Sequence, residues 1–207
     1  MTSSEVDLDA EKTDRVKIFI VEDSEIIRVG LAVILTPVPV FKIVGQAADG
    51  QSGLDGIRSA QADLAIVDIG LPDMSGIALT ERIKAEMPNL KVLMFTSHDD
   101  EHDMFQAFAA GADGYVVKHD FDRARLQLAI LTVAHGKCWL DPLIARRILQ
   151  FATHQKLDVP SSLRSKGVMA QPLTDEEVNV LSGAEDCNGV CSVSPEFLQR
   201  LRRFVNA

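Results

Sequence analysis

Five polar side chains in this sequence stand at the ends of short apolar runs. They are Glu22, Asp23, Asp68, Thr96 and Lys118. Carboxylates that lie close together repel one another and bind a hard cation such as Mg2+ through their oxygens. A carboxylate can attack phosphorus and form an acyl phosphate, while a lysine and a hydroxyl stabilise the phosphoryl oxygens. Any one of these acids alone fits a solvated charge equally well, but together the five side chains predict a site for phosphoryl transfer.

The apolar runs alternate with helix-type patterns. The runs predict strands at residues 17–21, 41–45, 64–67, 92–95 and 114–117. Helices are expected from the capping residue Ser24 to near Pro37, and then over residues 50–60, 76–87, 101–110 and 121–134. Five strands alternating with five helices predict an α/β fold, in which a parallel, doubly wound sheet carries helices on both faces. Ligands of such sheets bind beyond the carboxyl ends of the strands, where the five polar side chains are expected to meet.

Residues 16–136 resemble the receiver domains of two-component response regulators. The matching motifs are Val21-Glu22-Asp23, the ten residues VDIGLPDMSG at 67–76, Phe95-Thr96-Ser97, and GADGYVVK at 111–118. The last of these motifs is similar to the form found in the NarL/LuxR-type subfamily. The resemblance implies a flavodoxin-like receiver fold with five parallel strands. It also implies a signalling protein that accepts phosphate from a histidine kinase or a phosphotransfer protein, and not an enzyme with a diffusible substrate.

The same resemblance implies a magnesium site around the acceptor. Asp68 would be the phosphoacceptor and, with Asp23, a direct ligand of Mg2+. The backbone carbonyl of Gly70 would be a third ligand, and Glu22 would help through a water molecule. Position 70 carries a larger side chain in many members of the family, and this difference bears on the lifetime of the phosphoryl group.

Two further roles follow from the resemblance. Thr96 and Lys118 would bind the phosphoryl oxygens, and Thr96 would act together with Tyr115 as the switch. Tyr115 also fits a half-buried strand residue with no switching role. An inactive receiver that has kept its motifs is a further alternative.

The remainder of the chain falls into three segments. Residues 1–15 are expected to be a disordered acidic arm, residues 137–172 a helix and a linker, and residues 173–207 a short helical output remnant. The start of the last segment resembles the opening of the NarL/LuxR-type DNA-binding domain. The stretch that follows is several residues shorter than in that family, and the last helix is incomplete.

Charge separates two hypotheses for the output. Between Pro160 and Ala207 there are five basic and six acidic side chains, unlike the basic surface of most DNA-binding domains. This composition favours signalling through protein contacts or self-association, as in a homodimer. The alternative is a transcription regulator that binds DNA when phosphorylated.

Overall composition indicates an intracellular protein. The formal net charge is −9, no apolar run approaches the roughly 20 residues needed to cross a membrane, and the acidic start is not a signal peptide. Three cysteines are expected to be free thiols in the cytoplasm. Zinc binding or redox switching by Cys187 and Cys191 is the weaker alternative.

Overall fold

The computed structural model describes residues 15–98, 100–120, 122–140, 191–193 and 199. The expected acidic arm, the helix after Asp141, the linker and Cys187 lie outside these residues. Most of the expected output remnant also lies outside them, although Gln199 is helical. Within the described ranges no helix is both long enough and apolar enough to cross a bilayer.

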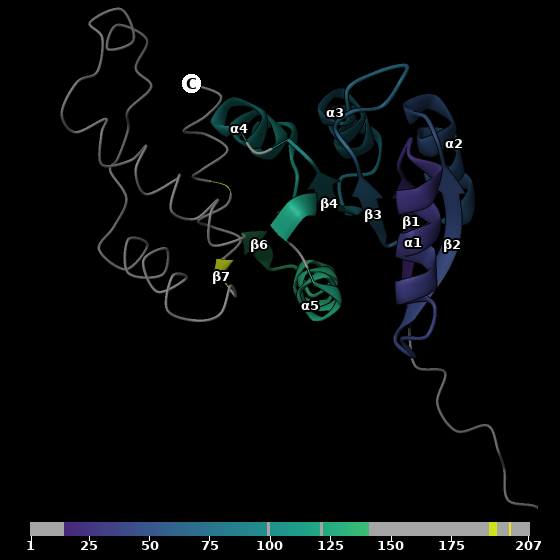
Figure 1. Ribbon diagram of the computed structural model, residues 1–207. Helices are drawn as coiled ribbons and strands as arrows, with labels where there is room; N and C mark the ends of the chain where they lie inside the picture. Colours follow the sequence, from purple (N-terminus) through teal and green to yellow (C-terminus); the bar gives the residue numbers. More distant parts are fainter. Residues whose placement is uncertain (1–14, 99, 121, 141–190, 194–198, 200–207) are drawn as a thin grey trace, which may run out of the picture.

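The expected alternation of strands and helices is observed. The strands are β1 (Val16–Val21), β2 (Phe41–Ala47), β3 (Leu64–Val67), β4 (Lys91–Thr96), β5 (Gly114–Val117), β6 (Cys138–Leu140) and β7 (Cys191–Val193). The helices are α1 (Glu25–Leu35), α2 (Gly50–Ala60), α3 (Gly76–Glu86), α4 (Glu101–Ala110) and α5 (Arg123–Ala134), with a short 3-10 turn at Lys118–Asp120. The sheet order is β2-β1-β3-β4-β5-β6-β7, and the first six strands are joined in parallel (Figure 1).

Helices cover both faces of the sheet, as the prediction required. Side chains alternate along each strand, so Ile18 and Ile20 point into the core beneath α1 and α5, whereas Phe19 and Val21 point into the core beneath α2, α3 and α4. All four are buried. Strands that are buried on both faces lack polar alternation, which explains why the sequence shows them as continuous apolar runs.

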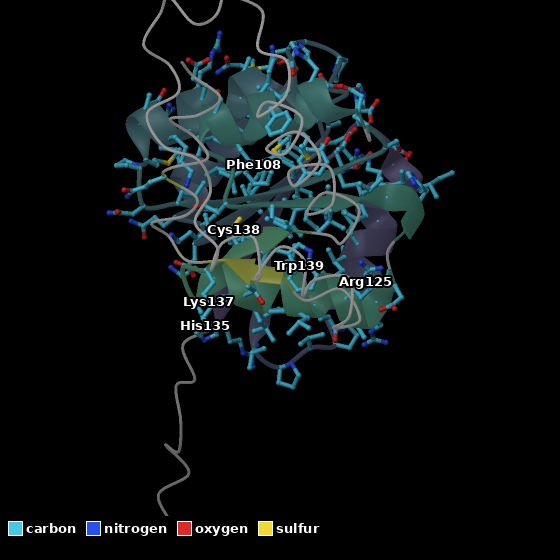
Figure 2. All side chains as sticks on the ribbon, turned by 90° about the vertical axis from the view of Figure 1, so that its left-hand side faces the viewer. Phe108, Arg125, His135, Lys137, Cys138 and Trp139 are labelled. Atoms are coloured by element: carbon cyan, nitrogen blue, oxygen red, sulfur yellow. The ribbon has the colours of Figure 1, made fainter. Side chains whose placement is uncertain are left out.

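The sheet continues beyond the five expected strands. β6 pairs in parallel with the outer edge of β5, with Tyr115 opposite Leu140, and β7 pairs antiparallel with β6. Trp139 is fully buried with the α5 core, while Cys138 and Leu140 lie in the core on the other face (Figure 2). Residues 138–140, expected to belong to the helix and linker segment, are therefore part of the receiver sheet.

Four helices begin with a side-chain cap. Asp49, Ser75, Asp100 and Asp122 each accept a hydrogen bond from a backbone N–H of the first helical turn. Ser24 occupies the corresponding position of α1, as expected, but its side chain makes no capping hydrogen bond. The prediction of a side-chain cap at Ser24 was therefore wrong. The backbone N–H of Ser24 instead donates to Glu22 Oε1 at 3.3 Å, which ties the start of α1 to the acidic cluster.

Candidate functional site: an acidic cluster at the strand ends

The five side chains identified in the sequence meet at the carboxyl end of the sheet. β1, β3, β4 and β5 are neighbours, so the residues at their ends are adjacent in space. Ligand oxygens of Glu22, Asp23 and Asp68 all lie within 4.8 Å of one another. Glu22, Asp68 and Thr96 are buried, whereas Asp23 is exposed. The cluster therefore has a buried floor and an open side formed by Asp23.

Lys118 balances part of the negative charge. Its ammonium lies 2.7 Å from Glu22 Oε2 and 3.2 Å from Asp68 Oδ1. Burial raises the pKa of Glu22 above its ordinary value, and the charge of Asp68 acts in the same direction, whereas the hydrogen bond and the charge of Lys118 oppose the shift. One cation faces two buried carboxylates, so the site retains negative charge.

The donor set fits a magnesium ion. Glu22 Oε2 and Asp68 Oδ1 are buried oxygens, and in the described part of the chain they share a single cation, the ammonium of Lys118. Buried carboxylate oxygens are costly without a cation or donors around them. Oxygen ligands at this spacing, with one open side for water, are what Mg2+ prefers. The residues therefore form an acidic site that can hold such an ion.

The loop after β3 is held in place by two features. A Cβ at Gly76 would lie 1.9 Å from the carbonyl oxygen of Asp68, so only glycine permits α3 to begin this close to the end of β3. Asp73 accepts hydrogen bonds from the backbone N–H groups of Gly50 and Gln51 at 2.7 and 2.9 Å. These bonds fasten the loop that carries Gly70 to the start of α2.

A chain of hydrogen bonds runs from Thr96 to Tyr115 through the backbone of His98. Thr96 Oγ1 accepts from the backbone N–H of His98 at 3.2 Å. The hydroxyl of Tyr115 donates to the carbonyl oxygen of His98 at 2.8 Å. Tyr115 is fully buried with its ring inward, and it is not the half-buried strand residue that the sequence also allowed. Phe105 and Phe108 on α4 are core residues.

His98 is a residue near the site that the sequence analysis did not single out. Its Nδ1 lies 2.5 Å from Asp103 Oδ2. A Cβ at Gly70 would stand 3.9 Å from its Nε2 and 3.5 Å from Asp68 Oδ2. The position of His98, two residues after Thr96, could have suggested that it lies near the site. Its contact with Asp103 could not be predicted, because it depends on where α4 begins.

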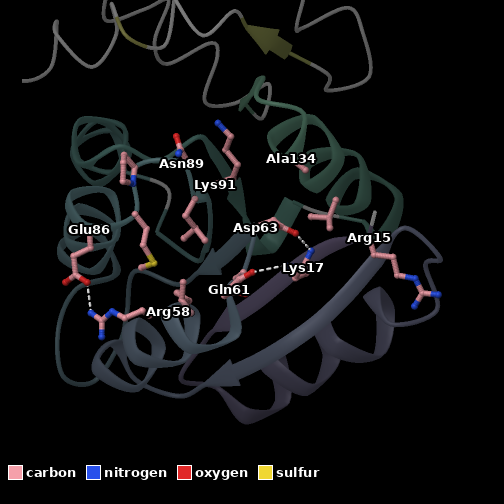
Figure 3. Close-up of a pocket in the computed structure, with 15 residues that line it drawn as sticks. Arg15, Lys17, Arg58, Gln61, Asp63, Glu86, Asn89, Lys91 and Ala134 are labelled. Carbon is pink, nitrogen blue, oxygen red and sulfur yellow. Dashed lines mark hydrogen bonds and ion pairs between the residues drawn. The ribbon is translucent and has the colours of Figure 1, made fainter. Parts of the chain in front are cut away.

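A cavity at the opposite end of the strands is not part of this cluster. It has a volume of about 910 Å³ and is bordered by Lys17, Asp63 and Lys91, which stand at or just before the amino ends of β1, β3 and β4 (Figure 3). Arg58 and Glu86 pair with each other on its wall. None of the five predicted side chains lines it.

This combination of fold and acidic cluster defines a receiver domain. The response regulator receiver domain family matches residues 18–131, and the chain belongs to that family. Among its relatives, the DNA-binding transcriptional activator DevR/DosR of Mycobacterium tuberculosis is 32% identical over 170 residues, which cover 79% of this chain and 78% of the relative. The oxygen regulatory protein NreC of Staphylococcus epidermidis is 31% identical over 70% of this chain and 67% of its own length.

Solved structures agree with this assignment. A LuxR-family response regulator from Aurantimonas sp. superposes with a TM-score of 0.63 at 30% identity, covering 70% of this chain and 99% of the other. The receiver domain of the response regulator NarL from Mycobacterium tuberculosis gives a TM-score of 0.57 at 28% identity, covering 59% and 98%. The expected NarL/LuxR-type receiver and its α/β fold are confirmed, and the chain is a two-component response regulator.

The anchor formed by Asp73 leads to a prediction about pH. The backbone N–H of Gly50 lowers the pKa of Asp73 more than any other group does. The charged carboxylate of Asp73 therefore stabilises the fold fully at pH values above the ordinary aspartate pKa. This stabilisation is lost as the pH falls through the lowered pKa of the folded state. We expect Asp73→Asn to unfold at lower urea concentration than the parent at pH 7, with the difference vanishing under strongly acidic conditions.

Urea titrations of the two proteins across a pH series measure this effect. Asp55→Asn is a matched control, because among the described residues the carboxylate of Asp55 contacts only Gln51 and Arg58, which are exposed on the same helix. A pH-independent difference for Asp73→Asn would contradict the role of its charge.

Proposed function

We propose that this response regulator accepts a phosphoryl group on Asp68 from a histidine kinase or a phosphotransfer protein. The observation that carries the proposal is the buried Asp68 carboxylate beside Glu22 and the Lys118 ammonium. In the reaction an oxygen of Asp68 forms a bond to phosphorus while the bond from phosphorus to the donor breaks. The product is an acyl phosphate, and no diffusible substrate is turned over.

Lys118 and Thr96 have separate roles in this proposal. The ammonium of Lys118 already lies against Asp68 Oδ1, so it is placed to bind an oxygen of the phosphoryl group through a charge-assisted hydrogen bond. Thr96 Oγ1 accepts from the N–H of His98 and can still donate its own hydrogen to a second phosphoryl oxygen. Because both groups are buried or nearly so, these bonds form in a medium of low dielectric constant, where they are stronger than in water.

We infer that Mg2+ is the metal, with Asp23, Asp68 and the Gly70 carbonyl as direct ligands and Glu22 acting through water. The support is the spacing of the three carboxylates, and the fact that the buried oxygens of Glu22 and Asp68 share a single ammonium group. When bound, the ion would neutralise the charge of the phosphoryl oxygens. Asp23 is exposed and can meet an entering hydrated ion, whereas Glu22 is held by Lys118.

An apolar stripe beside the site supports docking of a phosphoryl donor protein. Ile26, Val29 and Val33 on α1 are 86%, 50% and 64% exposed, although large apolar side chains are normally buried. α1 begins directly after the acidic cluster, so a partner that covers this stripe is next to Asp68. We assign the protein to the cytoplasm, and the buried thiol of Cys138 is compatible with a reducing compartment.

The output is proposed to pass through β5 and β6. Phosphorylation would place negative charge beside Thr96, and the bonds from Thr96 to His98 and from His98 to Tyr115 reach β5. Because Tyr115 is already inward, phosphorylation would stabilise this arrangement and not create it. β6 pairs with β5 and leads into the C-terminal segment, so we infer that phosphorylation changes the docking of residues 141–207 or self-association.

DNA binding is the second candidate, and one observation favours it. The match to DevR/DosR covers 79% of this chain, more than residues 1–131 comprise, so the similarity continues past the receiver domain. That relative is a DNA-binding transcriptional activator. The acidic balance between Pro160 and Ala207 remains the argument for protein contacts.

Phosphoryl acceptance by Asp68 is tested with acetyl phosphate and Mg2+. We expect the parent chain to become phosphorylated and Asp68→Asn to remain unlabelled, because an amide oxygen is a poor nucleophile toward phosphorus. Intact-mass spectrometry measures the added group, and circular dichroism checks that the variant is folded. Full labelling of Asp68→Asn would refute the assignment.

The metal ligands are ranked by calorimetric titration with Mg2+. We expect Asp23→Ala to weaken binding by tenfold or more, since a direct charged ligand is lost, and Glu22→Ala to weaken it less. Asp63→Ala is a control at the far end of β3, outside the cluster. Equal losses in the Asp23 and Glu22 variants would contradict the ranking.

The output is tested by saturating the full chain with beryllofluoride, which mimics a phosphoryl group. We expect a change either in molar mass, measured by light scattering, or in hydrogen exchange of residues 138–207. A gel-shift assay on duplex DNA across a salt series distinguishes the second candidate, because DNA contacts release counterions and weaken steeply with salt. If molar mass, hydrogen exchange and DNA affinity all stay unchanged, signalling through β5 and β6 is excluded.

A further inference from the structure

We propose that Arg28 is a positioning residue of the metal site, whose guanidinium fixes the turn that presents Glu22 and Asp23 and thereby raises the affinity for Mg2+. The inference arises from two hydrogen bonds that this side chain donates to the backbone between β1 and α1. It rests on the proposed magnesium site and on the proposed phosphorylation of Asp68. Arg28 itself touches neither the acceptor nor the metal in this scheme and acts through the two acids.

Arg28 reaches back from α1 over the turn that carries the two acids. The connection between β1 and α1 consists of Glu22, Asp23 and Ser24. The Nη1 nitrogen of Arg28 donates to the carbonyl oxygen of Glu22 at 2.6 Å and to that of Asp23 at 3.2 Å. One side chain thus holds the backbone of both acids from the side of the helix.

An arginine at this point of a helix is electrostatically unfavourable. Arg28 is the fourth residue of α1, and the first turn of a helix carries partial positive charge that disfavours a cation. The partial negative charge of the two carbonyl oxygens compensates for this position, and the side chain lies partly buried against the turn. The two hydrogen bonds therefore account for a residue that the helix alone does not favour.

The side chains of the two acids are held very differently. Glu22 accepts from the backbone N–H of Ser24 at 3.3 Å and lies 2.7 Å from the ammonium of Lys118. The carboxylate of Asp23 is exposed, and in the described part of the chain it has no comparable hydrogen bond or ion pair. The bond from Arg28 to the carbonyl of Asp23 therefore restrains the direction in which this proposed ligand leaves the chain.

Arg28 affects a bound cation in two opposite ways. Its positive charge lies beside the acidic turn and disfavours Mg2+ by Coulomb repulsion. Its hydrogen bonds hold the ligands in place before the ion arrives, so less conformational entropy is lost on binding. The second effect dominates, because the bonds are fixed in geometry whereas water and salt screen the charge. The sign of the change on removing Arg28 therefore distinguishes positioning from charge.

Calorimetric titration of the full chain with Mg2+ measures this sign. We expect Arg28→Ala to weaken binding by about tenfold, the lower end of the roughly 10–100-fold loss that follows removal of a group that holds a metal ligand. The loss should persist at high ionic strength, where charge effects are screened. Arg82→Ala is the matched control and should bind like the parent, since Arg82 is exposed on α3 and lies outside the cluster. Unchanged or tighter binding in Arg28→Ala would overturn the proposal.

Two further measurements separate positioning from general damage to the fold. With acetyl phosphate as donor, the Mg2+ concentration for half-maximal loading should rise about tenfold in Arg28→Ala, whereas the loading rate at saturating Mg2+ should match the parent. A rate that saturating Mg2+ does not restore would contradict the role. Arg28→Lys should recover part of the affinity, because its ammonium also donates on a long stem, and a lysine as weak as alanine would also contradict it. If urea unfolding shows that the alanine variant is not folded, Arg28→Gln takes its place with the same expectation.

Failure of the proposed function gives a different result. A parent chain that neither binds Mg2+ nor accepts a label would refute the metal site and the phosphorylation of Asp68, before the role of Arg28 is reached. A parent that binds Mg2+ and becomes labelled, with Arg28→Ala matching it in both, would leave phosphorylation standing and refute Arg28 alone.

Discussion

The rest of this site depends on the ion pairs that Lys118 makes with Glu22 and Asp68. Two buried carboxylates a few ångströms apart would otherwise repel each other or take up a proton. The lysine neutralises one of the two charges, and burial still raises the pKa of Glu22. The remaining charge, together with that of exposed Asp23, favours a cation at the open side. The fold thus holds three carboxylates close together although they repel one another, and a bound metal ion can reduce this repulsion.

That cluster exists because parallel strands bring their carboxyl ends to one edge. Chemistry-bearing residues far apart in the sequence then need no long loops to meet, only strands of suitable length. The loop after β3 is positioned more finely: Gly76 permits α3 to approach the end of β3, and Asp73 fastens the same loop to α2. Asp68 is itself buried at the end of β3, whose four residues all lie in the packed core.

The sequence predicted most of this arrangement but not all of it. The five strands were predictable because buried strands appear as continuous apolar runs, and the five helices appear between them. The ends of those runs placed Asp68 and Lys118 at the same edge of the sheet. β6 was missed because three residues, Cys138–Leu140, are too few to show a period, and their pairing with β5 is a tertiary effect. The inward ring of Tyr115 and the His98–Asp103 pair depend on side-chain geometry that no spacing encodes.

The strength of the switch is limited by what the site already contains. Moving an equilibrium from 1:99 to 99:1 requires about 5.5 kcal/mol of differential stabilisation. A hydrogen bond to a charged group contributes roughly 1.5–3 kcal/mol, but only a bond that differs between the two states counts. In the proposed switch, Lys118 is already paired and Tyr115 is already inward, so Thr96 would supply most of the difference on phosphorylation. One new bond of that size shifts the population only partly. A complete response therefore requires a second contribution, such as a partner or another copy of the chain that binds one state better.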